Sequence, residues 1–205
     1  MDKHKFQGKY RIESTRLKDY NYSRNGAYFV TICTKNSMHL FGSIVDQKLI
    51  PNRQAEVVTE CWLDLPAHYT NCVLDKLIIM PNHVHGIIII DNEIAETGLK
   101  LNNTIVATGL KPDKVVVVET GLKPVSTAGR VAKPYPLSEI IRGFKTFSAR
   151  RINEYQNTRG KAFWQSRFFD HIIRNREELK RIRQYIIENP LKWELEKNNH
   201  ENLFM

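Results

Sequence analysis

The sequence predicts an α+β fold in which an antiparallel sheet of four to five strands carries helices packed on it. Short segments rich in β-branched and aromatic residues occur in pairs, with turn residues between them. Segments with apolar residues at helical spacing follow these pairs. The predicted order is two strands, a helix, two strands, an insertion, a helix, a strand and a helix. This order is typical of an antiparallel sheet with helices on its faces.

Length and composition indicate one domain. The chain has 205 residues, of which 41% are hydrophobic, so we expect a single domain over residues 1–205 with an insertion. Its net charge is +9, which favours a polyanionic partner, nucleic acid before membrane. The three cysteines form no C-x-x-C pair, which argues against a zinc ribbon and fits a reducing cytosol. The polar N-terminus does not resemble a secretory signal, and charged residues and histidines interrupt the most apolar stretch, 73–90, so we expect no membrane segment.

The first half of the chain contains the clearest strand signals. Residues 27–34 predict a strand, and residues 39–50 predict its hairpin partner. A helix is expected over residues 52–69, with Asn52 as its N-cap. Residues 72–80 and 83–91 predict two further strands, joined in a hairpin by Pro81 and Asn82.

Residues 92–136 interrupt this rhythm. An imperfect repeat recurs there as ETGLK at 96–100, ATGLKP at 107–112 and ETGLKP at 119–124. The spacing is too short for a solenoid unit, and Gly and Pro recur. We therefore predict a long, flexible surface insertion at about 92–136.

The last third predicts a helix, a strand and a helix. Apolar residues trace a helical face over residues 137–156, with Ser138 near the cap, and residues 162–173 are extended. Asn175 and Glu178 resemble a capping box at the start of the last helix. Pro190 predicts the end of that helix.

His83 and His85 open the strand at 83–91. Residues two apart in a strand point to one face, so the two imidazoles project together and Val84 points the other way. Two imidazoles on one face are able to share a metal ion. A solvent-exposed pair, or one buried and one exposed histidine, is compatible with the same pattern.

The last helix offers a partner for this pair. Tyr185 and Asn189 are four residues apart and therefore share a face. With Leu179, Ile182 and Ile186 toward the core, they lie on the flank of the apolar stripe. The amide oxygen of Asn189 is a candidate third ligand. Alternatively, the tyrosine packs on the sheet and the asparagine serves the helix end.

Basic residues concentrate at 140–185, a segment that contains twelve Lys and Arg but only four Asp and Glu. Aromatic residues alternate with these cations, a composition typical of single-strand surfaces, in which cations contact phosphates and rings stack on bases. Some of the rings belong to the core in any fold, and a solvated basic helix would have a similar composition. The candidate DNA-binding residues are Arg142, Lys145, Arg150, Arg151, Trp164, Arg167 and Arg174.

Three blocks of the sequence resemble one family. PNHVHG is similar to the His-hydrophobic-His motif of HUH single-strand endonucleases. WQSRFFDHIIRN followed by QYIIENPLKW resembles the C-terminal signature of REP-associated tyrosine transposases, which are relatives of the transposases of small insertion sequences. YFVTICTKN with HLFG resembles their first hairpin. The resemblance covers about residues 20–195 except the insertion, and it implies a ferredoxin-like HUH fold.

The resemblance also implies a chemistry. It makes Tyr185 the nucleophile, and His83, His85 and Asn189 the ligands of Mg²⁺ or Mn²⁺. Family members cleave single-stranded DNA beside a hairpin through a 5′-phosphotyrosine. REP-associated members recognise palindromic repeats and a tetranucleotide guide. The resemblance further implies a cytoplasmic, nucleoid-associated protein that acts as a monomer or as a homodimer.

Two other functions compete with this one. A non-catalytic nucleic-acid-binding protein that recognises structured repeats would share the fold, but it would need none of His83, His85, Tyr185 and Asn189 together. A replication-initiator or relaxase nickase would share the chemistry, usually as one domain of a larger chain.

Overall fold

A four-stranded antiparallel sheet forms the centre of the molecule. The computed structural model describes residues 5–6, 9–10, 17–97 and 134–198. The strand order is β6-β7-β3-β8, and every neighbouring pair is antiparallel, which confirms the predicted α+β class. The strands are β3 (Gly26–Cys33), β6 (Cys72–Met80), β7 (His83–Ile90) and β8 (Phe169–Ile173).

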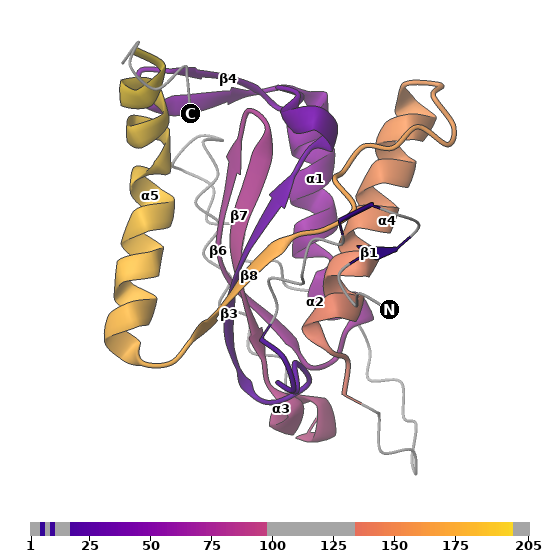
Figure 1. The fold of residues 1–205 in the computed structure, drawn as a ribbon, viewed down its shortest axis with the longest axis vertical. Helices are drawn as coiled ribbons and strands as arrows, with labels where there is room; N and C mark the ends of the chain where they lie inside the picture. The colour runs from indigo at the N-terminus through magenta and orange to yellow at the C-terminus, as the bar shows by residue number, and fades with distance from the viewer. Residues whose placement is uncertain (1–4, 7–8, 11–16, 98–133, 199–205) are drawn as a thin grey trace.

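Helices cover both faces of this sheet. The helices are α1 (Arg53–Leu63), α2 (Leu65–His68), α3 (Asn92–Thr97), α4 (Leu137–Tyr155), α5 (Arg176–Asn198) and a 3-10 turn at Lys35–Ser37. In Figure 1, α5 stands on one side of the sheet, and α1, α2 and α4 stand on the other. Small two-stranded sheets are formed by β1 (Lys5–Phe6) with β2 (Lys9–Tyr10) and by β4 (Gly42–Val45) with β5 (Lys48–Pro51). None of the helices in these described parts of the chain is long and apolar enough to span a membrane.

Alternation along the strands builds two separate cores. On β3, Val30 and Ile32 point toward α1 and α4, whereas Phe29 points toward α5. The larger core includes Trp62 and Phe144 from α1 and α4, which are fully buried. The smaller core lies under α5. Its buried members are Phe29, Ile78, Met80, Ile87, Ile173 and Ile186.

Gly86 allows the larger core to pack tightly against β7. A Cβ at this position would lie 2.3 Å from the ring of Trp62, so the indole occupies the space of the absent side chain. This close approach explains why a glycine directly follows the two histidines. The strand is thereby held from behind, on the face opposite His83 and His85.

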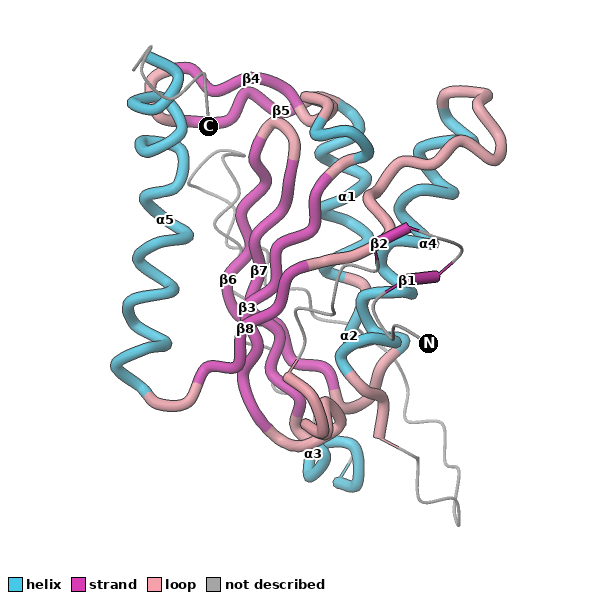
Figure 2. Tube along the Cα trace, viewed as in Figure 1, coloured by secondary structure: helices cyan, strands magenta, loops and turns pink. Residues whose placement is uncertain are grey.

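The predicted pairing of residues 27–34 with 39–50 is wrong. β3 pairs with β7 and β8, and residues 42–51 form their own hairpin from β4 and β5. Asp46 and Gln47 at its tip have φ of 48° and 59°, the left-handed values of a tight primed turn. Because both edges of β3 pair with distant strands, the nearer segment turns back on itself instead. The tube trace in Figure 2 shows this hairpin at the end of the sheet.

The predicted helix ends agree with the structure except at Pro190. Asn52 caps α1, because its Oδ1 accepts from the backbone N–H of Ala55 at 3.1 Å. Ser138 lies near the cap of α4, as predicted, as the second residue of a helix whose N-cap is Pro136. Pro190 does not end α5, which continues to Asn198 with the proline buried inside it. A proline inside a helix removes one hydrogen bond, and packing of Trp193, half-buried against the smaller core, offsets that loss.

The predicted repeat insertion lies mostly outside the described residues. Within it, α3 and residues 134–136 are described. Asn71 holds both ends of this segment, because its Nδ2 donates to Asn92 Oδ1 at 3.0 Å and to the carbonyl of Tyr135 at 3.1 Å. Asn71 therefore holds residues 92 and 135 close to each other.

Candidate active site

His83 and His85 project together from the start of β7, as the strand period predicts. Their Nε2 atoms are 3.0 Å apart, and the two rings meet edge to face. Val84 points into the larger core on the opposite face. The pair lies beneath α5, so the open end of the strand is covered by a helix.

Each histidine is oriented through its other ring nitrogen. Nδ1 of His83 lies 2.6 Å from Asn82 Oδ1, and Nδ1 of His85 lies 2.9 Å from the hydroxyl of Thr31. Asn82 Nδ2 donates to the carbonyl of Ser37, which directs its Oδ1 toward His83. His83 therefore donates from Nδ1 and has a lone pair on Nε2, because an amide oxygen only accepts. Polar partners on the second nitrogen are typical of metal-binding histidines.

Burial keeps both imidazoles neutral. His85 is 5% exposed. Desolvation lowers the pKa of His83 to about 4, and desolvation together with the charge of His83 lowers the pKa of His85 to about 3. Neutral imidazole is the form that binds metals. The pair is therefore ready to act as a ligand pair across the neutral pH range.

One face of α5 covers the pair. The ring of Tyr185 lies 5.5 Å from that of His85, and the ring of Trp193 lies 5.8 Å from that of His83. Residues four apart on a helix stack above one another, so Asn189 lies between these two rings on the face toward the histidines. Asn189 is 7% exposed. The structure thus brings Tyr185 close to His83 and His85, and the helical spacing places Asn189 on the same face of α5.

Tyr185 lies at the border between this site and solvent. Its side chain is 39% exposed. The ring meets Phe29 edge to face at 6.0 Å, and the ammonium group of Lys192 lies 5.0 Å from its centroid. Tyr185 is therefore packed on one side and partly open to solvent, with a cation nearby.

Polar contacts fix the position of α5. Arg183 binds Asp75 of β6, with Nη2–Oδ2 at 2.7 Å, and the side chain of Asp75 is 8% exposed. At the first turn, Asn175 Oδ1 accepts from the N–H of Glu178 at 2.8 Å, as predicted. Glu178 also accepts from the N–H of Arg174 and pairs with His171. These contacts hold α5 on the sheet of its own chain.

The predicted DNA-binding cations of α4 lie on the other face of the sheet. Arg142 pairs with Glu139 at 3.3 Å, and Arg150 pairs with Glu154 at 2.9 Å. Arg151 binds Glu60 at 2.6 Å and so joins α4 to α1. Because α4 packs on the larger core, these arginines lie across the sheet from the histidines. DNA that touches both surfaces must pass around an edge of the sheet.

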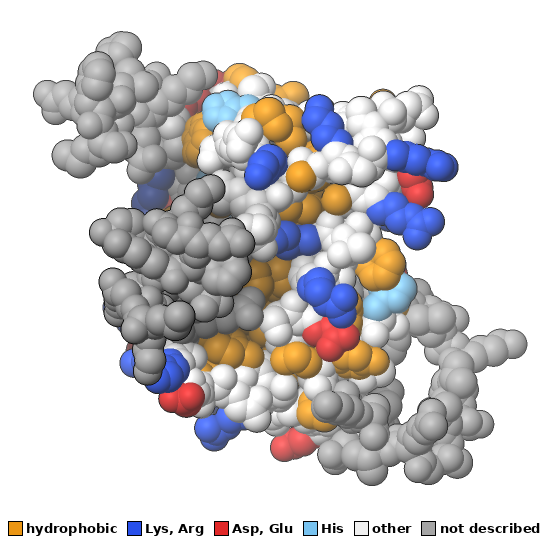
Figure 3. Space-filling view, turned by 45° about the vertical axis from the view of Figure 1, so that its right-hand side comes forward, with side chains coloured by type: hydrophobic (Ala, Val, Ile, Leu, Met, Phe, Trp, Pro, Cys, Tyr) orange, Lys and Arg blue, Asp and Glu red, His pale blue; other side chains and the backbone are white. Residues whose placement is uncertain are grey.

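The remaining predicted contacts divide into structural and exposed residues. Trp164 is 6% exposed and donates from Nε1 to Ser148 Oγ at 3.0 Å, so it is a core residue and not the predicted surface ring. Lys145 donates to the carbonyls of Gln165 and Ser166. Arg167 and Arg174 are exposed; one precedes and the other follows β8, the edge strand. Figure 3, which turns the α4 side forward, shows basic side chains spread over this face with hydrophobic ones between them.

Sequence reasoning missed several residues that build the site. Trp193 continues the four-residue spacing of Tyr185 and Asn189, a signal that the predicted stop at Pro190 concealed. Asp75 stands as a charge within an apolar strand, which is a mark of a buried ion pair. Thr31 carries no comparable signal, because its role depends on a strand pairing 54 residues away.

The donor set fits a divalent metal ion. Both Nε2 atoms converge, and both Nδ1 atoms have polar partners. No group of three or more His, Cys, Asp and Glu side chains gathers around a common point in the described parts of the chain. Further ligands would therefore be an amide oxygen, water or substrate oxygens, and open positions of this kind suit catalysis.

Comparisons with known proteins find a family, a relative and a solved structure that match this chain. The family described as "Transposase IS200 like" matches residues 129–189. A Haemophilus influenzae (strain Rd) protein described as "Uncharacterized protein" is 35% identical over 185 residues, which cover 88% of this chain and 89% of that protein. The solved structure of a REP-associated tyrosine transposase bound to a REP hairpin matches 86% of this chain and 73% of that chain, with a TM-score of 0.50 and 15% identity. At this identity the last match concerns the fold.

Proposed function

This chain belongs to the IS200-like transposase family, and from that premise we propose that it cleaves and joins single-stranded DNA beside a hairpin or palindromic repeat in a metal-dependent reaction. One observation carries the proposal: the ring of Tyr185 lies 5.5 Å from the ring of His85. His85 and His83 form a pair of neutral, oriented imidazoles. A protein that only binds nucleic acid has no need of this arrangement.

Tyr185 supplies the nucleophile. Its Oη attacks the scissile phosphorus, the bond from phosphorus to the 3′ oxygen breaks, and a 5′-phosphotyrosine forms. The hydroxyl proton passes to water, which reaches this side chain because it is 39% exposed, and the 3′ oxygen takes up a proton. Attack by a 3′ hydroxyl on the phosphotyrosine reverses these changes and joins a new strand.

His83, His85 and Asn189 would hold Mg²⁺ or Mn²⁺. When bound, the cation would offset the charge on the non-bridging oxygens and orient the phosphate for in-line attack. Thr31 and Asn82 fix the ring orientations, and the hydroxyl of Thr31 is able either to donate to His85 or to accept from it. An amide donor together with open positions favours Mg²⁺ or Mn²⁺ over Zn²⁺.

The substrate class comes from the solved relative, whose structure holds a REP hairpin. We extend hairpin DNA to this chain, as a substrate in the cytoplasm and nucleoid. The exposed Arg167 precedes the end of β8 that lies nearer the histidines, so it is the cation best placed to contact a strand that runs from α4 to the site. Arg174 follows the opposite end of β8 and would contact a more distant part of the DNA.

The test is cleavage of single-stranded oligonucleotides that contain the palindromes flanking the gene, with and without Mn²⁺. We expect cuts beside the hairpin that require the metal. Hairpin binding with no cleavage under either Mg²⁺ or Mn²⁺ would favour the non-catalytic binding protein instead.

A further inference from the structure

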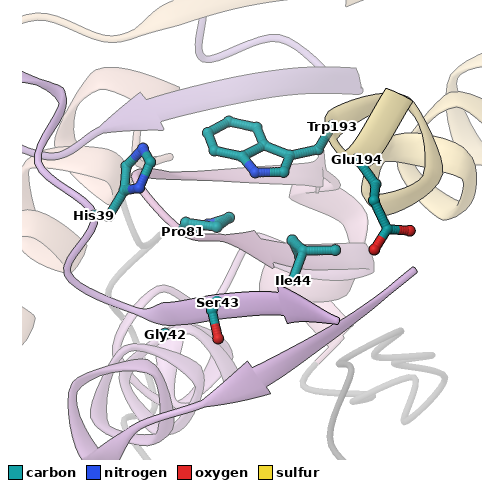
Figure 4. Close-up of a pocket in the computed structure, with 7 residues that line it drawn as sticks. All are labelled: His39, Gly42, Ser43, Ile44, Pro81, Trp193 and Glu194. Atoms are coloured by element: carbon teal, nitrogen blue, oxygen red, sulfur yellow. The ribbon is translucent and has the colours of Figure 1, made fainter. Parts of the chain in front are cut away.

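A pocket of about 230 Å³ opens beside the histidine pair, between the β4–β5 hairpin and the last turns of α5. Figure 4 shows the indole of Trp193 above Pro81, between His39 and Ile44. The pocket is smaller than the ~300–1,000 Å³ of sites for drug-sized ligands. Its lining consists of His39, Gly42, Ser43, Ile44, Pro81, Trp193 and Glu194.

Trp193 connects this pocket to the candidate active site. Its ring lies 5.8 Å from the ring of His83 and 5.4 Å from the ring of His39. Tyr185 stands eight residues earlier on α5, which is about 12 Å along the helix axis. A nucleic-acid strand rises ~3.4 Å per nucleotide even when stacked, so a few nucleotides span that distance.

The pocket combines flat rings with a hydrogen-bond acceptor. Trp193 and His39 offer aromatic surfaces on which a base stacks. Glu194 Oε2 accepts from the backbone N–H of Gln47 at 3.1 Å. Among the described residues Oε1 has no hydrogen-bond donor, so it is available to a ligand. A carboxylate repels phosphate and accepts from N–H groups, such as those on the edge of a base.

We propose that this pocket binds one unpaired base of the DNA strand, within a few nucleotides of the phosphate that Tyr185 attacks. The proposal rests on the proposed function and adds a base-specific contact to it. Lys192 lies 5.0 Å from the Tyr185 ring centroid, on the stretch of helix between the two sites, and supplies a cation for an intervening phosphate. Glu194 selects a base whose N–H group reaches it.

Both walls of the pocket depart from what local sequence rules predict. One wall is the hairpin that turns back on itself instead of pairing with β3, and the other is the part of α5 beyond Pro190. The bond from Gln47 to Glu194 joins the two walls. Departures from local rules are expected to gather at functional sites.

An abasic scan of the substrate tests the proposal. The Tyr185→Phe protein, which is expected to bind without cutting, is titrated with hairpin oligonucleotides that lack one base at each single-stranded position in turn. One position should show a roughly tenfold or greater loss of affinity, because base–aromatic stacking is lost there. In Tyr185→Phe with Trp193→Leu, removing that same base should cost less than about twofold. Tyr155→Leu, at an aromatic residue that is 64% exposed on α4, is the matched control and should keep the full loss.

A second variant keeps the test independent of core packing. Glu194→Ala should reduce discrimination among the four bases at the sensitive position, whereas Glu177→Ala in the first turn of α5 should leave it unchanged. Normal hairpin binding with no position coupled to Trp193 or Glu194 would overturn the pocket and leave the proposed function intact. Failure to bind any hairpin would overturn both.

Discussion

The two halves of α5 contact parts of the molecule that the sequence predicts with very different success. Its first half covers the middle of the sheet, where β3, β6 and β7 follow from strand period and β propensity. Its second half meets the β4–β5 hairpin, where the pairing and the helix end both differ from the sequence prediction. Local patterns suffice where propensity and burial agree. They fail where the partner is chosen by contacts distant in sequence.

Substitution of either histidine, beneath the first half of α5, should have the largest effect on activity. His83→Ala or His85→Ala should abolish cleavage, because each removes one of the two converging Nε2 atoms that we propose as metal ligands. Hairpin binding should persist, since cations elsewhere supply the phosphate contacts. Cleavage and binding are measured on the same labelled oligonucleotide.

His68→Ala is the matched control for this experiment. His68 is exposed and pairs with Asp64 away from the sheet face that carries the site. It should retain normal cleavage. Wild-type cleavage by either His83→Ala or His85→Ala would remove the ligand assignment.

Gly86→Ala tests how the rear of β7 holds the histidines. The new Cβ would lie 2.3 Å from the buried Trp62 ring, so we expect a loss of about 1–3 kcal/mol in the free energy of unfolding. Gly26→Ala on β3 is the control, because its nearest atom is at an ordinary 3.6 Å. Urea unfolding compares the two variants. Equal stability of Gly86→Ala and Gly26→Ala would show that Trp62 does not require this glycine.

Acid should destabilise the folded protein through the same pair. Burial lowers the folded-state pKa values of His83 and His85 to about 4 and about 3, below the ordinary value of 6.5. Between pH 6.5 and these lower values the unfolded chain binds more protons than the folded protein, so the free energy of unfolding falls as the pH drops. From pH 6.5 to 5 we expect a loss of about 1–3 kcal/mol.

The control is the double variant His83→Gln/His85→Gln, which has no imidazole to titrate at these positions. Its stability, measured by urea unfolding, should change less than that of the wild type over the same pH interval. Parallel curves for the two proteins would mean that the pair is not buried in solution.

Gln47→Gly should produce the smallest effect and concerns the poorly predicted end. The φ of 59° at Gln47 is unfavourable for a residue with a Cβ, so glycine should stabilise the hairpin by up to about 1 kcal/mol. Lys48→Gly in the adjoining strand should instead destabilise. Urea unfolding of both variants measures the two changes in the free energy of unfolding. A destabilising Gln47→Gly would argue against the tight turn that forms the pocket wall.

Much of the site is predictable from spacing alone. The strand period places His83 and His85 on one face, and the helix period places Tyr185 and Asn189 together. Spacing within one element does not reveal which element it meets. Thr31 and Asp75 therefore gain their roles only through pairings across the fold.

The aromatic residues mark a second limit. Trp164 stands among cations in the sequence and yet is 6% exposed, whereas Phe147 and Tyr155 are exposed on the same side of the fold. Composition gives the number of rings near the cations but not their direction. Burial is decided by the packing of α4 on the sheet, where Ser148 accepts the hydrogen bond from Trp164.

The most direct test of the account is the identity of the residue that becomes joined to DNA. The protein is incubated with a 5′- or 3′-labelled hairpin oligonucleotide and Mn²⁺, separated by denaturing electrophoresis, and the modified peptide is mapped by mass spectrometry. We predict a single adduct at Tyr185, joined to the 5′ phosphate. Tyr185→Phe should fold, bind the hairpin and form no adduct, at a stability cost of about 1 kcal/mol or less. An adduct at another tyrosine, or one that survives in Tyr185→Phe, would contradict the central claim.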